Sequence, residues 1–285
     1  MKRVAVVGAG TMGHGIAQVA AAAGYETLLA DANTEAVASA LASIKQNLDG
    51  GVSRGKTTRA DADATLARIK TVDTVDQAVR DVAVVIEAIV ENLETKQRLF
   101  QRLETIVKPE TVLATNTSSL SVTDIAAATS RPERLLGMHF FNPVHIMKLL
   151  EIVVHDHSDE QVVDRASALA QAMGKQPIRV RDTPGFASSR LGVVLGLEAM
   201  RMLEQDVASA EDIDKAMELG YGHPMGPLRV SDLVGLDVRL AIAEYLHSQL
   251  GEAHYRPPEI LRNKVEAGEL GKKSGMGFYD WKAGR

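Results

Sequence analysis

The chain of 285 residues contains no cysteine, and aromatic residues make up only 4% of it. The absence of cysteine excludes disulfides, thiolate nucleophiles, zinc–thiolate sites and iron–sulfur clusters. It also fits a reducing compartment, so we expect a cytoplasmic protein. The remaining composition, 45% hydrophobic and 24% charged, is that of an ordinary globular protein and excludes collagen-like and disordered classes.

An excess of positive charge and a long apolar run are also missing. The net charge is −5, so we expect neither a nucleic-acid partner nor an anionic membrane surface as partner. No stretch reaches the roughly 18 apolar residues of a membrane span. The apolar residues 4–7, which follow Lys2 and Arg3, end at Gly8 and predict a strand rather than a signal peptide.

Short apolar runs alternate with helical patterns in the first part of the chain, and 285 residues suffice for one large or two modest domains. This alternation predicts an α/β fold with a mostly parallel sheet covered by helices on both faces. The predicted strands are residues 4–7, 27–30, 82–86, 112–114 and 135–140, with 149–154 and 177–180 as edge strands. The predicted helices are 11–23, 34–48 and 92–106, with a capped short helix after Ser121 and an exposed loop at 50–58.

The pattern changes after the sequence Asp182-Thr183-Pro184-Gly185. From there on we find only helical patterns, at residues 191–204, 210–219, 230–250 and 257–267. We therefore expect a domain boundary near Thr183, with an α/β domain at 1–183 and an all-helical domain at 184–285.

A glycine motif lies between the first predicted strand and the first predicted helix. Gly8, Gly10 and Gly13, with Thr11 and Met12 between them, form the spacing G-x-G-x-x-G, and Asp31 ends the next strand. Together these features are the dinucleotide fingerprint of a Rossmann domain, in which the helix N-terminus stabilises the pyrophosphate. The carboxylate of Asp31 favours NAD over NADP because it repels a 2′-phosphate. The alternative is a glycine-rich turn without a ligand.

Polar residues also follow the predicted strand at 112–114, at the sheet edge where ligands bind in such folds. Asn116, Thr117, Ser118 and Ser119 can contact a substrate or the nicotinamide ribose, although a plain polar turn with a helix cap is an equal alternative.

His139 ends a strand, where it can exchange a proton with a substrate hydroxyl. Glu151 lies within an apolar run and needs a partner, because an unpaired buried charge is costly. A pair of these two residues would orient the imidazole and stabilise its protonated form. The alternative for His139 is a hydrogen-bonded core histidine.

A metal site is not expected. His155, Asp156 and His157 are adjacent, but they would alternate between the two faces of an extended segment, and no second group of ligands accompanies them.

These motifs resemble the L-3-hydroxyacyl-CoA dehydrogenase family, in its short-chain 3-hydroxybutyryl-CoA branch, over nearly the whole chain. Seven segments match in order: the glycine motif at 8–13, Glu-Ala-Ile-Val-Glu-Asn at 87–92, Asn-Thr-Ser-Ser-Leu at 116–120, His-Phe-Phe-Asn-Pro at 139–143, Asp-Thr-Pro-Gly-Phe at 182–186, Pro-Met-Gly-Pro at 224–227, and Gly-Lys-Lys-Ser-Gly at 271–275 followed by Gly-Phe-Tyr at 277–279.

The resemblance implies reversible NAD-dependent oxidation of an L-3-hydroxyacyl-CoA and a homodimer formed through the helical domain. It implies that His139 is the catalytic base, that Glu151 is its partner and that Ser118 contacts the substrate oxygen. The positions that it implies for contact with cofactor or substrate are Glu91, Lys96, Asn142 and Lys273, with Lys96 close to both. Lys56 matches a basic residue that meets the CoA phosphates.

One position departs from the family pattern. Three residues after Phe186 the family usually has an asparagine that bonds the substrate carbonyl, and Ser189 stands there in this chain. The shorter hydroxyl can still donate a hydrogen bond, directly or through a water. Either that contact is kept or it is lost, with consequences for substrate preference.

Two other functions remain open at this point. One is a dehydrogenase of the same architecture that acts on a free hydroxy acid such as L-gulonate or carnitine. The other is a non-catalytic NAD-binding sensor, against which the pairing of His139 with Glu151 argues.

Overall fold

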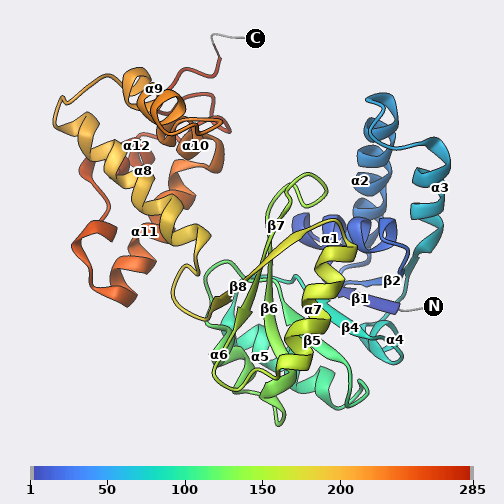
Figure 1. Cartoon of the computed structure of the whole chain (residues 1–285). Helices are drawn as coiled ribbons and strands as arrows, with labels where there is room; N and C mark the ends of the chain where they lie inside the picture. Colours follow the sequence, from blue (N-terminus) through green and yellow to red (C-terminus); the bar gives the residue numbers. More distant parts are fainter. Residues whose placement is uncertain (1–2, 283–285) are drawn as a thin grey trace. The chain divides into compact units, whose positions relative to one another are not determined.

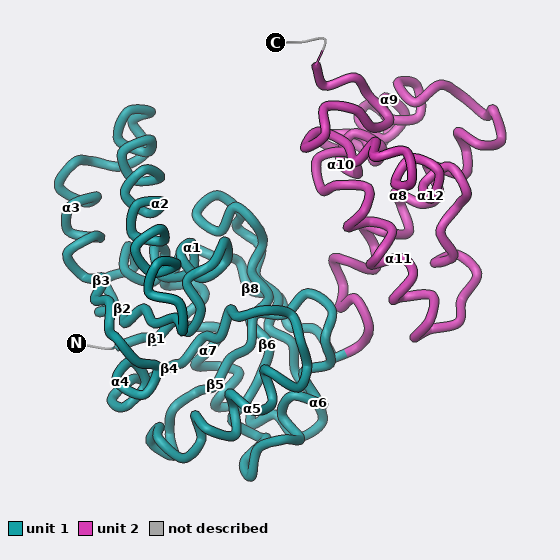
Figure 2. The backbone as a smooth tube through the Cα atoms, turned by 180° about the vertical axis from the view of Figure 1, so that it is seen from behind, with its two compact units in different colours: residues 1–182 teal, residues 183–285 magenta. Residues whose placement is uncertain are grey.

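The structure, a computed structural model, describes residues 3–282. The chain divides into two compact units between Asp182 and Thr183, and Figure 2 distinguishes them by colour.

Unit 1 is built on one eight-stranded sheet with the order β3-β2-β1-β4-β5-β6-β7-β8 (Figure 1). All neighbours are parallel except β6 and β7, which are antiparallel. The strands are β1 (Arg3–Val7), β2 (Glu26–Ala30), β3 (Ile69–Thr71), β4 (Val84–Glu87), β5 (Val112–Thr115), β6 (Leu135–Phe140), β7 (Leu149–Val154) and β8 (Gln176–Arg181). The helices are α1 (Thr11–Ala22), α2 (Thr34–Ser53), α3 (Arg59–Arg68), α4 (Val75–Val79), α5 (Leu93–Glu104), α6 (Val122–Ala126), α7 (Glu160–Ala172) and the 3-10 turn η1 (Pro132–Arg134).

The central strands are buried on both faces, which explains their continuous apolar runs. Every residue of β4, β5 and β6 is buried. The face that includes Val4 and Val6 packs against α1, α2, α3 and α7, whose apolar residues join it in one core. Helices α5 and α6 lie over the other face (Figure 1).

The strand order reverses beside β1, which lies between β2 and β4. In sheets of this kind, ligands bind outside the carboxyl ends of the strands at such a switch point. The fold therefore brings the loops after β1, β2, β4, β5 and β6 to one edge. The glycine motif, Asp31, residues 116–119 and His139 lie in or beside these loops. His155, Asp156 and His157 follow the antiparallel strand β7 and lie at the opposite edge, where His155 Nε2 is within hydrogen-bonding distance of the Leu135 carbonyl at the start of β6.

The described part of unit 2, residues 183–282, contains helices and no strand, apart from isolated β-bridges of Met276 with Gly271 and Asp280. Its helices are α8 (Ser188–Glu204), α9 (Ala210–Gly220), α10 (Pro227–Val234), α11 (Leu236–Leu250), α12 (Glu259–Glu266) and the 3-10 turn η2 (Ala253–Tyr255). They enclose a core of their own that includes Leu197, Leu228 and Leu246. The buried carboxylate of Asp232 accepts hydrogen bonds from the backbone N–H groups of Phe278 and Tyr279, which ties the last segment to α10.

The α/β architecture followed by a helical region confirms the predicted fold class, but several elements differ from the prediction. The helix predicted at 230–250 is wrong, because Gly235 adopts a φ of +104° and separates α10 from α11. The loop predicted at 50–58 is wrong at its start, because α2 continues to Ser53. Helices α3, α4 and α7 and strand β3 lie where the sequence predicted no element.

Within residues 3–282, no helix combines the length and the apolar character that crossing a bilayer requires.

Candidate functional site

The glycine motif packs the start of α1 tightly against the end of β1. Gly8 has a φ of +105°, and a Cβ atom there would lie 2.4 Å from the carbonyl oxygen of Ala88. A Cβ atom on Gly13 would lie 1.8 Å from the carbonyl oxygen of Gly8. Both distances are far shorter than a carbon–oxygen contact, so only glycine fits at either position.

The N-terminus of α1 suits the pyrophosphate of a dinucleotide. No side chain among residues 3–282 caps this end of the helix, and a Cβ atom on Gly10 would meet open space. An anion can therefore approach the N–H groups and the positive end of the helix dipole. Asp31 lies beside this turn, where its carboxylate accepts hydrogen bonds from the backbone of Ala9 at 2.7 Å and Asn33 at 2.8 Å. These residues fit NAD.

A cavity of about 780 Å³ opens at the carboxyl ends of the strands in unit 1. It brings together most of the site residues that the sequence predicted in this unit. The predicted residues on its wall are Gly8, Gly10, Thr11, Met12, Asp31, Glu91, Asn116, Ser118 and His139. The dinucleotide motif and the proposed catalytic histidine thus face one space.

His139 and Glu151 form the pair that the sequence predicted. They are opposite residues in the antiparallel register of β6 and β7, and Nδ1 of His139 lies 2.7 Å from Oε2 of Glu151. The side chain of Glu151 is fully buried, and that of His139 is 8% exposed. Because Nδ1 is directed at the carboxylate, Nε2 is the ring atom that can serve a substrate. The pair lies next to the ring of Phe141, 4.5 Å from the imidazole centroid.

Asn116 fixes the strand end that carries His139. Its side-chain oxygen accepts a hydrogen bond at 3.0 Å from the backbone N–H of Phe140. Asn116, which the sequence predicts to contact the cofactor, therefore also has a structural role, because it links the end of β5 to the end of β6.

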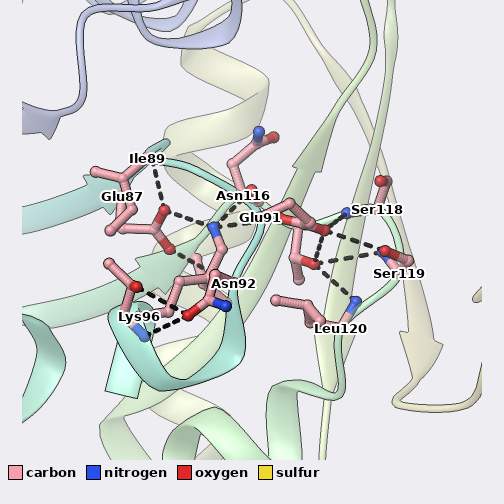
Figure 3. A network of polar contacts seen from close by, with 12 residues as sticks. Glu87, Ile89, Glu91, Asn92, Lys96, Asn116, Ser118, Ser119 and Leu120 are labelled. Carbon is pink, nitrogen blue, oxygen red and sulfur yellow. Dashed lines mark hydrogen bonds and ion pairs between the residues drawn. The ribbon is translucent and has the colours of Figure 1, made fainter. Parts of the chain in front are cut away.

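Glu91 organises the loop that carries Ser118. Its Oε1 atom accepts hydrogen bonds from the Thr117 hydroxyl at 2.5 Å and from the Ser118 backbone N–H at 3.1 Å. The Ser119 hydroxyl donates to the same oxygen at 3.3 Å. One carboxylate thus holds three consecutive residues of the loop (Figure 3).

Lys96 lies beneath this loop rather than on the cavity wall. Its ammonium is fully buried, 2.6 Å from Oε1 of Glu87 and 3.4 Å from Oε2 of Glu91 (Figure 3). Glu87 is also fully buried and accepts further hydrogen bonds from the Thr115 hydroxyl and the Ile89 backbone N–H. Burial raises the pKa of the Glu87 carboxyl, and the ammonium of Lys96 opposes that rise.

Two further predicted residues of unit 1 do not line the dinucleotide cavity, and two predicted residues belong to unit 2. Asn142 is exposed in the segment after β6. Lys56 lines a second cavity of unit 1, of about 940 Å³, between α1, α2, α3 and residues 145–148. Ser189 lies in the first turn of α8, and Lys273 in unit 2 pairs with Asp237 at 2.5 Å.

Sequence reasoning missed several residues at these sites. Glu87 ends the buried strand β4, and a carboxylate in an apolar run is the same signal that pointed to Glu151. Arg102 lines the dinucleotide cavity and pairs with Asp76 at 2.8 Å, for which the sequence offers no signal. His145 lines the second cavity. Its position shortly after Asn142 and Pro143 was the sequence feature that could have pointed to it.

Within residues 3–282, no group of three or more histidine or acidic side chains is arranged to hold a metal ion.

The sheet order, the glycine turn, Asp31 and the buried histidine–carboxylate pair define a dinucleotide-dependent oxidoreductase. The NAD-binding domain of 3-hydroxyacyl-CoA dehydrogenase matches residues 3–183, and the C-terminal domain of the same enzyme matches residues 185–281. The chain belongs to the 3-hydroxyacyl-CoA dehydrogenase family, whose members are NAD-dependent oxidoreductases.

Relatives of known name match nearly the whole of this chain. A probable 3-hydroxybutyryl-CoA dehydrogenase of Bacillus subtilis is 46% identical over 281 residues, covering 99% of this chain and 98% of the relative. A 3-hydroxyadipyl-CoA dehydrogenase of Escherichia coli is 43% identical, covering 100% of this chain and 60% of the relative. The crystal structure of (S)-3-hydroxybutyryl-CoA dehydrogenase from Ralstonia eutropha superimposes with a TM-score of 0.94 at 39% identity, covering 99% of each chain.

Proposed function

We propose that the protein interconverts L-3-hydroxybutyryl-CoA and acetoacetyl-CoA with NAD as the electron carrier. The observation that carries this proposal is the buried pair of His139 and Glu151, in which His139 lines the dinucleotide cavity together with Ser118. Relatives named as 3-hydroxybutyryl-CoA dehydrogenases support a four-carbon thioester as the substrate, rather than a free hydroxy acid.

In the oxidation, Nε2 of His139 takes the proton of the 3-hydroxyl group. Bound NAD supplies the acceptor for the hydride that leaves C3. The carboxylate of Glu151 holds the ring through Nδ1 and stabilises the imidazolium that forms. Ser118 donates a hydrogen bond to the reacting oxygen, and Ser189 takes the place of the usual asparagine at the substrate carbonyl. In the reduction, His139 returns the proton to the oxygen.

The cofactor is bound by the glycine turn, with Thr11 and Met12 in the first turn of α1 beside the pyrophosphate. Asp31 binds the adenosine ribose, and Glu91, Asn116, Asn142 and Lys273 contribute towards the nicotinamide half. We assign Lys96 to cofactor and substrate indirectly, since its buried ammonium holds Glu91 and the carbonyl of Asn116.

The coenzyme A moiety binds at the second cavity of unit 1. Its wall carries the cationic side chains of Arg54, Lys56, Arg68 and Lys148 and the single carboxylate of Asp61. This positive balance suits the phosphates of coenzyme A.

Residues 1–183 act as the NAD-binding domain, and residues 184–285 contribute to substrate binding and form a homodimer in the cytoplasm. Leu191 and Val238, apolar and exposed on helices of unit 2, support a surface of association. Light scattering coupled to gel filtration tests the dimer, and a monomeric mass at micromolar concentration contradicts it.

Steady-state reduction of 3-ketoacyl-CoA substrates by NADH tests the proposed activity. We expect the highest kcat/KM for acetoacetyl-CoA in a series from four to sixteen carbons that also includes 3-ketoadipyl-CoA. Free acetoacetate serves as the matched control without the coenzyme. Equal turnover of the free acid and its thioester contradicts the proposed substrate class.

A further inference from the structure

The second cavity contains a histidine that the proposed mechanism does not use. His145 is half-buried and lies on the cavity wall with Arg54, Lys56, Arg68 and Lys148. The carboxylate of Asp61, which shares this wall, accepts a hydrogen bond at 2.6 Å from the hydroxyl of Thr58. His145 is thus an imidazole placed among cations.

The loop that carries His145 is held firmly. The buried ammonium of Lys175 donates hydrogen bonds to the carbonyl oxygens of Val144 and Met147, which flank His145. The Pro143 carbonyl accepts hydrogen bonds from the backbone N–H groups of Ile146 and Met147, each at 3.0 Å. A Cβ atom on Gly15 would lie 2.7 Å from Val144, so α1 presses against the same loop. His145 therefore projects from a fixed backbone.

The charges that face His145 come from each element around it. His14 faces it from α1, Arg54 from the end of α2, and Lys175 from the turn before β8. Burial lowers the pKa of the His145 imidazole, and these three groups lower it further. Arg68 and Asp61 on α3, with Lys56 and Lys148, complete the charged wall. An anion in this cavity would reverse the balance, because it stabilises the protonated ring.

We propose that His145 is a further phosphate-binding residue of this cavity, and that it binds a phosphate of the coenzyme A moiety as an imidazolium formed by uptake of one proton from solvent. The proposal rests on the proposed function, which places coenzyme A there through Lys56. It adds a proton-dependent contact to a site that otherwise consists of permanently charged side chains.

Calorimetric titration with adenosine 3′,5′-bisphosphate tests the proposal on the full chain. Wild type and His145→Gln are compared at about pH 6 and about pH 8, at constant ionic strength. The phosphates of the probe also titrate near pH 6, so the quantity of interest is the ratio of the two dissociation constants at each pH. We expect His145→Gln to bind roughly fivefold more weakly at the lower pH and nearly equally at the higher pH, since a charge-assisted hydrogen bond is lost only where the ring is protonated.

A second readout is the number of protons taken up on binding, obtained by repeating the titration in buffers of different ionisation enthalpy. Wild type should take up a larger fraction of a proton than His145→Gln near pH 7. The matched control is His157→Gln, which removes an exposed imidazole elsewhere in unit 1 and should match wild type in both readouts. Equal proton uptake and equal pH dependence in wild type and His145→Gln overturn the proposal.

The test separates this inference from the proposed function. If acetoacetyl-CoA is reduced but His145→Gln behaves as wild type, the role of His145 is wrong and the activity stands. If the probe binds in the His145-dependent manner but acetoacetyl-CoA is not reduced, the anion site stands and the activity is wrong. Failure of wild type to bind the probe contradicts both the site and its histidine.

Discussion

Nδ1 of His139 lies 2.7 Å from Oε2 of Glu151, and the two residues are register partners on neighbouring antiparallel strands. The sheet itself therefore sets the orientation of the imidazole. The only antiparallel contact of this eight-stranded sheet, within the described residues, thus joins the two groups that the chemistry needs.

Glu151→Gln keeps the size of this partner and removes its charge. We expect kcat for acetoacetyl-CoA reduction to fall by about 10²-fold, since the orienting and charge-stabilising partner of a catalytic histidine is lost. Stopped-flow or steady-state rates at saturating NADH measure the effect. A kcat within twofold of wild type would remove Glu151 from the mechanism.

Asp31→Asn tests the choice between NAD and NADP. The variant lacks the negative charge that repels a 2′-phosphate, so the ratio of kcat/KM for NADPH to that for NADH should rise by about tenfold, equivalent to roughly 1.4 kcal/mol. Rates with both cofactors at equal acetoacetyl-CoA concentration give the ratio. An unchanged ratio would show that another residue excludes NADP.

Lys96→Met leaves the buried carboxylate of Glu87 without its ammonium partner at 2.6 Å. Breaking such a pair costs about 3–5 kcal/mol, and we expect a loss of that order in the free energy of unfolding. Urea unfolding followed by circular dichroism measures it.

The free energy of unfolding of the same variant should also depend on pH in a characteristic way. Burial raises the pKa of Glu87 in the folded state above its ordinary value of 4.5. At pH values above 4.5, the folded state therefore binds a proton at Glu87 more readily than the unfolded state does. Stability therefore falls as pH rises through this window, and it should fall more steeply in Lys96→Met than in wild type. The double variant Lys96→Met with Glu87→Gln should lose this extra slope; a slope that persists would place its origin elsewhere.

Ser189→Ala tests the position at which this chain departs from the family. If the hydroxyl donates to the substrate, kcat/KM for acetoacetyl-CoA should fall by roughly threefold to tenfold, the range of one neutral hydrogen bond. Ser189→Asn restores the usual donor and should retain or exceed wild-type kcat/KM. Unchanged kinetics in Ser189→Ala would show that the contact has been lost in this chain.

Much of unit 1 was predictable because its signals are local. The apolar runs of β1, β2, β5 and β6 and the glycine turn each follow from a few adjacent residues. Helix α3 escaped prediction because its sequence is polar and buries only Ala62 and Thr65. The break at Gly235 was hidden because the apolar pattern continues across it and only the backbone turns.

The candidate site was predictable from the sequence where the chemistry of one residue required a partner of a particular kind. Glu151 needed a cation or donor, and His139 supplied it. The burial of Lys96 was not visible in the same way, because its partner Glu87 lies nine positions earlier on another element. His145 became significant only in the structure, where it lines the same cavity as Arg54 and Arg68.

The most direct test of the account is the rate of acetoacetyl-CoA reduction by NADH in wild type and His139→Ala, with the NADH dissociation constant measured alongside. The account predicts a fall in kcat of about 10²–10⁴-fold with NADH binding within about twofold of wild type. Equal kcat in the two proteins would show that His139 is not the catalytic base.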